Sequence, residues 1–364
     1  MKLRLILATA AAVLTLLPVT AEAATTTDDT RIQQVLDEMA GVGGLAARIV
    51  DGGQVRDFKA GVADPMNPAK PPVPDRARFR VGSTTKSFVA TVVLQLVNEG
   101  RLDLDAPARG YFPHPLLKNR AITIRHLLNH TSGIPDYDGE LYQDAKDIQD
   151  LLDRVRYTTY TLRDVLKLAR KSTDDVPPFG SFGYANTNYT LLALVIERVT
   201  GRAYAEEVTR RVLRPLGLGD TYFPGTDPMI VGPHTEAYIP VGPDVPLANV
   251  TDWNPSAFNA AGELISTPAD LAAFTQALLS GRLLPAHLLR QMVTGAEWGL
   301  GIEFWKTSCG KDLFGHTGAA IGVYSMMFGT RDGSRQFAVA FTPGGSKGAS
   351  MANAQKMVDA AFCS

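Results

Sequence analysis

A long apolar helix and two reactive side chains are combined in one stretch of the chain, RVGSTTKSFVATVVLQLVNEG, residues 80–100. Ser83 and Lys86 stand three positions apart where this predicted helix begins, so they share a face within hydrogen-bonding reach. The positive end of the helix dipole favours a serine alkoxide and disfavours a lysine proton, so a neutral Lys86 can accept the hydroxyl proton of Ser83. In the alternative interpretation, Ser83 is a plain N-cap and Lys86 is solvated.

The S-x-x-K pattern is weak support when it stands alone, because it occurs a second time at Ser308 to Lys311. That copy contains Cys309 and Gly310 and is typical of a turn, with no helix to align its two side chains. The choice between a reactive pair and an ordinary helix start therefore depends on the rest of the chain.

The segments around residues 80–100 predict an α/β (α+β) protein with one sheet built from both ends of the chain. A helix is expected over residues 31–40, followed by two strands in 45–53 and 55–64 that are joined by a Gly-Gly turn. After the middle of the chain, Ser266 or Thr267 caps a helix that begins with Pro268. The remaining elements are β-like runs at 297–305, 323–330 and 335–343, and a last helix at 349–362.

Between these segments the chain consists of short helical patterns separated by Pro-rich and Gly-rich joints. We therefore expect a helical lobe over residues 105–261, inserted into a sheet lobe made from residues 31–104 and 262–364. The chain has 364 residues, which is about right for two such lobes.

The first 23 residues have the layout of a cleaved secretory signal: Lys2 and Arg4, an apolar run, and an A-x-A end at Ala23. Because no other stretch is long and apolar enough to span a bilayer, we expect a secreted protein without a membrane anchor. Cys309 and Cys363 are the only cysteines, and in an exported chain they are expected to form a disulfide between the last helix and a strand. Two separate buried thiols are the alternative.

The charge of the chain argues against nucleic acid as a partner. Its 36 Lys and Arg residues balance 37 Asp and Glu residues, for a formal net charge of −1, so no basic field is available. A small neutral or zwitterionic substrate fits this balance better.

Two further motifs favour the interpretation of Ser83 and Lys86 as a catalytic pair. FGYANTNY, residues 182–189, supplies Tyr184 and Asn186 in a loop before a helix, and FGHTGAAIG, residues 314–322, supplies His316, Thr317 and Gly318 just before a strand. Each motif alone is more often structural, as a cap, a half-buried ring or a turn. Together they give the order S-x-x-K, Y-x-N, H-T-G, which parallels the serine acylase pattern S-x-x-K, S-D-N, K-T-G.

On these motifs the chain resembles the serine penicillin-binding protein and class C β-lactamase superfamily, and is most similar to secreted bacterial D-alanyl-D-alanine carboxypeptidases. The matching stretches cover nearly the whole chain: VGSTTKSF (81–88), LLNHTSGIPDY (127–137), YANTNY (184–189), GHTG (315–318) and AAFCS (360–364). The resemblance implies an antiparallel sheet of about five strands flanked by helices and packed on an all-helical lobe, with the site between them.

The resemblance also implies a role for each motif residue. Ser83 would be the acylated nucleophile, Lys86 its base, and Tyr184 the group that passes protons to the leaving group. The opposite wall and the substrate contacts would come from Asn186, His316, Thr317, Gly318 and Ala319, with the backbone N–H groups of Ser83 and Ala319 as the oxyanion hole. A monomer without metal or cofactor would act on small peptides containing D-amino acids, and β-lactams would be covalent inhibitors or substrates.

Two positions depart from the carboxypeptidase pattern. Glu303 stands where that subgroup has an arginine for the terminal carboxylate of the substrate, and Ala319 stands where it has a threonine. A carboxylate is repelled by Glu303, so a D-amino-acid amidase, D-peptidase or esterase becomes an alternative, as does a β-lactamase. Lys306 and Arg331 are other candidate clamps. A sensor that is acylated by penicillin at Ser83 without useful turnover is the non-enzymatic alternative.

Two rival motifs are rejected on their chemistry. GGSKG, residues 344–348, matches the G-x-S-x-G nucleophile elbow, but no histidine follows Ser346, as an α/β-hydrolase requires. His126 and His130 have the spacing of a zinc-binding helix, yet the glutamate of H-E-x-x-H is absent. Core packing and a local cap explain this pair better.

Overall fold

The computed structural model describes residues 27–41, 43–172, 175–242, 247–295, 297–343 and 351–363. The predicted signal at residues 1–23 and the GGSKG stretch at 344–348 lie outside these ranges. Within the described ranges, no helix has the length and apolarity needed to cross a bilayer.

Six antiparallel strands form the main sheet, in the order β2-β1-β10-β9-β8-β7. Their bounds are β1 Gly44–Asp51, β2 Gln54–Gly61, β7 Glu303–Lys306, β8 Asp312–Ala320, β9 Val323–Thr330 and β10 Arg335–Thr342. β1 comes from the N-terminal segment and pairs with β10 from the C-terminal segment. One sheet is therefore built from both segments, as predicted. Gly52 and Gly53 have positive φ in the turn between β1 and β2, which confirms the expected hairpin.

Strand β8 was not predicted, and its position corrects the expectation for the H-T-G motif. His316, Thr317 and Gly318 lie inside this strand rather than before one. Gly315 and Gly318 weaken the sequence pattern of a strand, yet neither position has space for a side chain. A Cβ on Gly315 would lie 1.9 Å from the carbonyl oxygen of Met327, and one on Gly318 would lie 2.0 Å from that of Val81.

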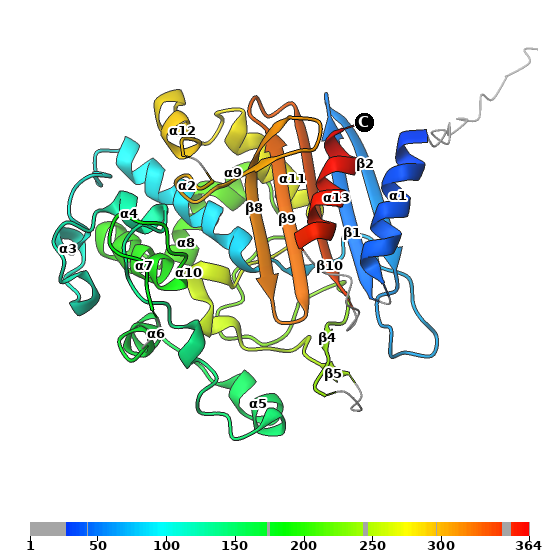
Figure 1. Cartoon of the computed structure of the whole chain (residues 1–364), viewed down its shortest axis with the longest axis horizontal. Coiled ribbons are helices and arrows are strands. Elements are labelled where there is room, and N and C mark those ends of the chain that lie inside the picture. Colours follow the sequence, from blue (N-terminus) through cyan, green and yellow to red (C-terminus); the bar gives the residue numbers. More distant parts are fainter. Residues whose placement is uncertain are drawn as a thin grey trace, which may run out of the picture.

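Helices cover both faces of the sheet. α1 (Thr27–Ala40) and α13 (Met351–Phe362) lie side by side on one face (Figure 1), where Phe337 and Val339 of β10 join their apolar cluster. Ala338 and Ala340 point the other way, into the cluster that contains α11 (Pro268–Leu279), as expected from the two-residue period of a strand. Thr267 is the N-cap of α11 and accepts the Asp270 N–H at 3.2 Å, so one of the two predicted caps is confirmed.

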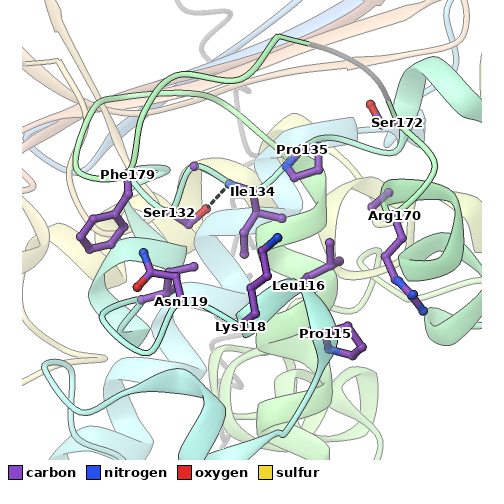
Figure 2. Close-up of a pocket in the computed structure, with 13 residues that line it drawn as sticks. Pro115, Leu116, Lys118, Asn119, Ser132, Ile134, Pro135, Arg170, Ser172 and Phe179 are labelled. Atoms are coloured by element: carbon purple, nitrogen blue, oxygen red, sulfur yellow. Dashed lines mark hydrogen bonds between the residues drawn. The ribbon is translucent and has the colours of Figure 1, made fainter.

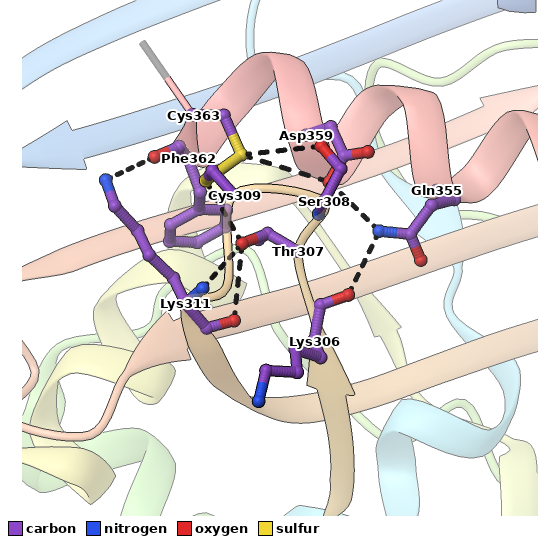
Figure 3. Close-up of a disulfide and its surroundings, with 9 residues drawn as sticks. All are labelled: Lys306, Thr307, Ser308, Cys309, Lys311, Gln355, Asp359, Phe362 and Cys363. Carbon is purple, nitrogen blue, oxygen red and sulfur yellow. Dashed lines mark hydrogen bonds between the residues drawn. A yellow bond between two sulfur atoms is a disulfide. The ribbon is translucent and has the colours of Figure 1, made fainter.

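The predicted disulfide is confirmed between Cys309 and Cys363, with Cα atoms 5.8 Å apart. It joins the end of α13 to the turn between β7 and β8, not to a strand (Figure 3). The second S-x-x-K copy is this turn, as predicted: Lys311 Nζ donates to the carbonyl of Phe362 rather than to Ser308.

Short helices gather on the other side of the molecule, beside the long buried helix α2 (Figure 1). The helices of this part are α2 Thr85–Asn98, α3 Ala108–Tyr111, α4 Ile124–Leu128, α5 Ile148–Asp153, α6 Leu162–Ala169, α7 Asn186–Thr200, α8 Tyr204–Val208, α9 Arg214–Leu216, α10 Asn259–Gly262 and α12 Ala286–Met292. The short strands β3 Phe79–Arg80 and β6 Ile265–Ser266 pair with each other, as do β4 Tyr238–Ile239 and β5 Ala248–Asn249. The lobe limits of 105 and 261 stay a prediction.

Candidate active site

Ser83 lies in a single turn of 3₁₀-helix, Gly82–Thr84, directly before α2. The N-cap residue of α2 is Thr84, and it makes no side-chain capping bond, so the interpretation of Ser83 as an N-cap is wrong. Gly82 has φ +51°, and a Cβ there would lie 2.3 Å from the carbonyl oxygen of Ala319. Glycine therefore lets the turn that carries Ser83 approach the backbone of β8 closely.

Lys86 is fully buried and its amine has three oxygen neighbours. Its Nζ lies 3.0 Å from Ser83 Oγ, 2.7 Å from Asn186 Oδ1 and 2.7 Å from the carbonyl oxygen of Ala261. Burial lowers the pKa of Lys86 to about 7, although Asp136 and other nearby carboxylates oppose this effect. A substantial share of Lys86 is therefore neutral near pH 7 and able to accept a proton.

Tyr184 completes the hydrogen bonds around the serine. Its hydroxyl donates to Ser83 Oγ at 2.8 Å, and burial raises the pKa of the phenol well above its usual range, so the donor stays protonated. The ring of His130 stacks on Tyr184 with centroids 4.3 Å apart, and its Nδ1 accepts the Ala185 N–H at 3.2 Å. His130 thus belongs to the packing that positions Tyr184.

His126, the other residue of the rejected zinc motif, serves as a cap. Its Nδ1 accepts the Thr123 N–H at 3.2 Å in the capping box of α4. Core packing for His130 and a local cap for His126 are what the sequence predicted.

Two aspartates, for which no role was predicted, orient Asn186. Asp136 Oδ2 accepts from the Asn186 backbone N–H at 3.0 Å and from its Nδ2 at 3.1 Å, while Asp138 Oδ2 accepts from Nδ2 at 2.8 Å. With its amide nitrogen held in this way, Asn186 presents Oδ1 to Lys86. Asp136 was part of a quoted motif, but only tertiary contacts reveal what it binds.

Glu303, the first residue of β7, holds the H-T-G residues of β8 in place. These residues form the wall of the site opposite Lys86. Glu303 Oε1 accepts from the Thr317 N–H at 3.0 Å and from Thr317 Oγ1 at 2.7 Å, and it lies 3.1 Å from His316 Nδ1. Trp305 Nε1 donates to Oε2 at 3.1 Å. The residue that departs from the carboxypeptidase pattern is therefore a buried carboxylate that fixes the H-T-G motif.

The surroundings of His316 determine where its proton sits. Burial lowers the pKa of His316, so the imidazole is neutral at pH 7 and carries one proton. Its Nδ1 faces two acceptors, the carbonyl oxygen of Thr317 and Glu303 Oε1, which places the proton on Nδ1. The buried Nε2 is then an acceptor, and it has no hydrogen-bond partner among the described residues.

Strand β8 continues beyond its pairing with β7. The register pairs β7 with Asp312 through Gly315 and stops there, so the following residues of β8 have no β7 partner. This part of the strand, which contains Gly318 and Ala319, packs against the turn that carries Ser83.

The structure brings the predicted residues together in two groups. Ser83, Lys86, Tyr184 and Asn186 form one hydrogen-bonded group, and His316 and Thr317 form another around Glu303. Trp298 joins the groups, since its ring centroid lies 5.4 Å from those of both Tyr184 and His316. No role was predicted for Trp298.

The two other residues considered as binding groups for a substrate carboxylate have partners outside the catalytic group. Lys306 Nζ lies 3.7 Å from Asp312 Oδ1, and the Arg331 guanidinium lies over the ring of Phe314, 5.5 Å from its centroid.

Comparison with known proteins agrees with this geometry. The sequence matches the Beta-lactamase family over residues 30–361, and the chain belongs to that family. It is a hydrolase of the serine β-lactamase and penicillin-binding protein superfamily.

Three relatives illustrate the range of the family. The chain is 37% identical to a D-stereospecific amidohydrolase from Streptomyces sp., with a TM-score of 0.81 over 92% of this chain and 98% of that structure. It is 26% identical to the D-amino acid amidase from Ochrobactrum anthropi SV3 complexed with L-phenylalanine amide, with a TM-score of 0.79 over the same shares. It is 27% identical to penicillin-binding protein 4 from Amycolatopsis lactamdurans, over 68% of each chain. The chain spans 28% to 68% of the length of the first curated relatives it matches.

Proposed function

We propose that this chain is a D-stereospecific serine amidohydrolase that forms an acyl-enzyme on Ser83 with amides or short peptides of D-amino acids. One observation carries the proposal: a fully buried lysine, with its pKa lowered to about 7, lies 3.0 Å from the serine hydroxyl. A structural lysine is rarely buried without a carboxylate partner, and here the contacts of Nζ are neutral oxygens.

In the first half-reaction, Ser83 Oγ attacks the carbonyl carbon of the substrate while neutral Lys86 accepts its proton. The negative charge that develops on the carbonyl oxygen is stabilised by the N–H groups of Ser83 and Ala319, each worth roughly 3 to 4 kcal/mol in related chemistry. The C–N bond then breaks. Tyr184, which donates to Ser83 Oγ, relays a proton from Lys86 to the leaving nitrogen, so ammonia or an amine departs neutral.

In the second half-reaction, water attacks the acyl carbon and the bond to Ser83 Oγ breaks. Neutral Lys86 accepts the proton of this water, and Tyr184 donates its proton to the departing Ser83 Oγ and is reprotonated from Lys86, which releases the free D-amino acid. The same pair of groups serves both steps because their protonation states are restored after each turnover.

The charges around the site favour a substrate with an ammonium group over one with a carboxylate. Asp136, Asp138 and Glu303 all lie near enough to Lys86 to raise its pKa, which opposes the effect of burial. Burial, and then the charge of Asp136, raise the pKa of Asp138 to about 7, so its charge is only partial near pH 7. The negative field of Asp136 and Glu303 attracts the free α-ammonium of a D-amino-acid amide and repels the terminal carboxylate of a D-alanyl-D-alanine peptide. The carboxypeptidase activity expected from the sequence therefore has less support than the amidase alternative.

An aromatic surface beside the site favours apolar D-side chains. Phe182 is 44% exposed and stacks on Trp298 with ring centroids 5.3 Å apart. Trp298 in turn packs on Tyr184, next to the serine. An aromatic or branched substrate side chain gains burial against this pair.

Secretion belongs to the same proposal. The disulfide between Cys309 and Cys363 is the kind of bond that persists in oxidising compartments, which agrees with the signal expected at residues 1–23. Expression of the full chain and N-terminal sequencing of the protein in the medium test this part. A mature start near residue 24 is expected, and retention of the uncleaved chain inside the cell would contradict it.

Activity is tested with a small panel of substrates. D-phenylalaninamide, L-phenylalaninamide and N-acetyl-D-alanyl-D-alanine are compared by release of ammonia or D-alanine from the wild type and from Ser83→Ala. We expect the order D-amide, then D-alanyl-D-alanine peptide, then L-amide, with no turnover by Ser83→Ala. Faster release of D-alanine would favour the carboxypeptidase instead.

A further inference from the structure

A cavity of about 540 Å³ lies behind the segment that leads to Asp136, away from Ser83. Its wall includes the consecutive residues Ser132 to Pro135, and its other side is formed by the region before α4 and by the end of α6. The volume falls in the range of small-molecule sites in proteins, which is about 300 to 1,000 Å³.

Two cationic side chains enter this cavity from different elements. Figure 2 shows Lys118 and Arg170 on either side of Leu116, with Ile134 and Pro135 above them. Among the described residues, neither cation has an ion pair or a side-chain hydrogen bond, and none of the residues that line the cavity is a carboxylate. Nearby Arg125, in contrast, is held by both oxygens of Asp105.

The positive potential extends beyond the cavity. Burial and then the charges of Arg170 and Arg163 lower the pKa of His114, which adjoins the lining residue Pro115. Lys118 and Arg170 are both exposed, so their charges are available to an anion that enters the cavity.

The floor of the cavity is apolar. It is formed by Leu116, Ile122, Ala169 and Phe179. Phe179 is 41% exposed, so an apolar group placed here covers surface that otherwise contacts water. A small inorganic anion would satisfy the two cations and leave this surface uncovered.

We propose that this cavity, bounded by Lys118 and Arg170, is a second binding site, specific for an organic carboxylate that carries an apolar chain. The carboxylate lies between the two cations and the chain lies on Leu116 and Ile134. This chemistry is opposite to the one proposed for the catalytic centre, where Asp136 and Glu303 disfavour anions. The two sites therefore select different ligands.

The wall of the cavity is connected to the catalytic group by short contacts. Ser132 Oγ donates to Asn188 Oδ1 at 2.7 Å and accepts the Ile134 N–H at 3.2 Å. The next residue after this wall is Asp136, which holds Asn186, and Asn186 Oδ1 accepts from Lys86. A ligand that shifts Ile134 or Pro135 thus moves the anchor of Asn186, and we expect occupancy to change the rate of acylation of Ser83.

Binding is tested by titration calorimetry of the full chain carrying Ser83→Ala, so turnover cannot interfere. Octanoate is the probe, and octanamide is its uncharged control. We expect one octanoate per chain, at least tenfold weaker binding of octanamide, and about fivefold loss of octanoate affinity for each of Lys118→Met and Arg170→Met. Arg282→Met removes an exposed cation elsewhere and should leave the affinity unchanged.

Several results would overturn the site. These are no binding of octanoate, equal binding of octanamide, an affinity unaffected by both Lys118→Met and Arg170→Met, or displacement of octanoate by equimolar inorganic phosphate. Displacement by phosphate would show that the site binds anions in general and that the apolar floor does not contribute to binding.

The coupling rests on the proposed function and has its own readout. The acylation rate is measured with D-phenylalanine methyl ester over a titration of octanoate, for the wild type and for Lys118→Met. A change in rate whose half-maximal octanoate concentration is about fivefold higher in Lys118→Met supports the coupling. An unchanged rate while calorimetry shows binding would overturn the coupling and leave the site intact.

Discussion

The two walls of the catalytic centre are built differently. On the wall formed by α2, α7 and the turns before them, the motif residues Ser83, Lys86, Tyr184 and Asn186 form one hydrogen-bonded group, in which aspartates outside the motifs orient only Asn186. On the β8 wall, His316 and Thr317 depend on Glu303, which comes from the neighbouring strand β7. In the proposed mechanism, the first wall supplies the proton transfers, and Glu303 on the second wall contributes to the negative field that favours an ammonium group.

The largest expected effect tests the first wall. Lys86→Ala removes the proposed base and should lower the acylation rate by roughly 10² to 10⁴-fold, the usual contribution of general acid–base catalysis. Stopped-flow measurement with D-phenylalanine methyl ester gives the rate. Lys311→Ala, in the second S-x-x-K copy, is the matched control and should keep the wild-type rate. Equal losses in both variants would contradict a special role for Lys86.

A smaller effect is expected on the second wall. Glu303→Gln removes a negative charge at nearly constant shape, so the preference for D-phenylalaninamide over its N-acetyl derivative should fall about tenfold, as expected for a near, partly buried charge. The ratio of kcat/KM for the two substrates measures this preference. Glu297→Gln, an exposed carboxylate nearby, should leave the ratio unchanged. An unchanged ratio in Glu303→Gln would show that Glu303 is structural only.

The pH dependence of the acylation rate should follow the protonation of Lys86. The pKa of Lys86 is lowered to about 7, and only its neutral form accepts a proton, so the acylation rate should fall as the pH drops below about 7 and level off above it. Asp136 raises this pKa, so Asp136→Asn should move the acid limb to lower pH. A profile of acylation rate against pH for both proteins is the measurement. A limb that moves upward would contradict the sign of this interaction.

The smallest effect on activity is expected at the far end of β7 and β8. Cys309→Ser breaks the disulfide that joins their turn to α13, and should lower the free energy of unfolding by about 2 to 4 kcal/mol. Chemical denaturation measures this loss. Because Glu303 and His316 keep their own contacts, kcat/KM should stay within about twofold of the wild type. A large loss of activity would show that the second wall depends on the disulfide.

Local patterns in the sequence identified the motif residues of both walls, but not the residues that hold them in place. Ser83 and Lys86 stand at helical spacing, and the sheet formed by both chain ends followed from apolar alternation. The strand that carries His316 was missed because Gly315 and Gly318, required by backbone packing, dilute a strand pattern. Asp136, Trp298 and the anchoring role of Glu303 depend on contacts between segments far apart in the sequence, which no local pattern records.

The central claim is that Ser83 is acylated by a D-amino-acid derivative. Its most direct test is intact mass spectrometry after rapid acid quench of the protein with D-phenylalanine methyl ester, for the wild type, Ser83→Ala and the matched control Ser308→Ala. We predict one D-phenylalanyl group on the wild type and on Ser308→Ala, located on the peptide that contains residue 83, and none on Ser83→Ala. An adduct that persists in Ser83→Ala, or hydrolysis of the ester by that variant at the wild-type rate, would contradict the account.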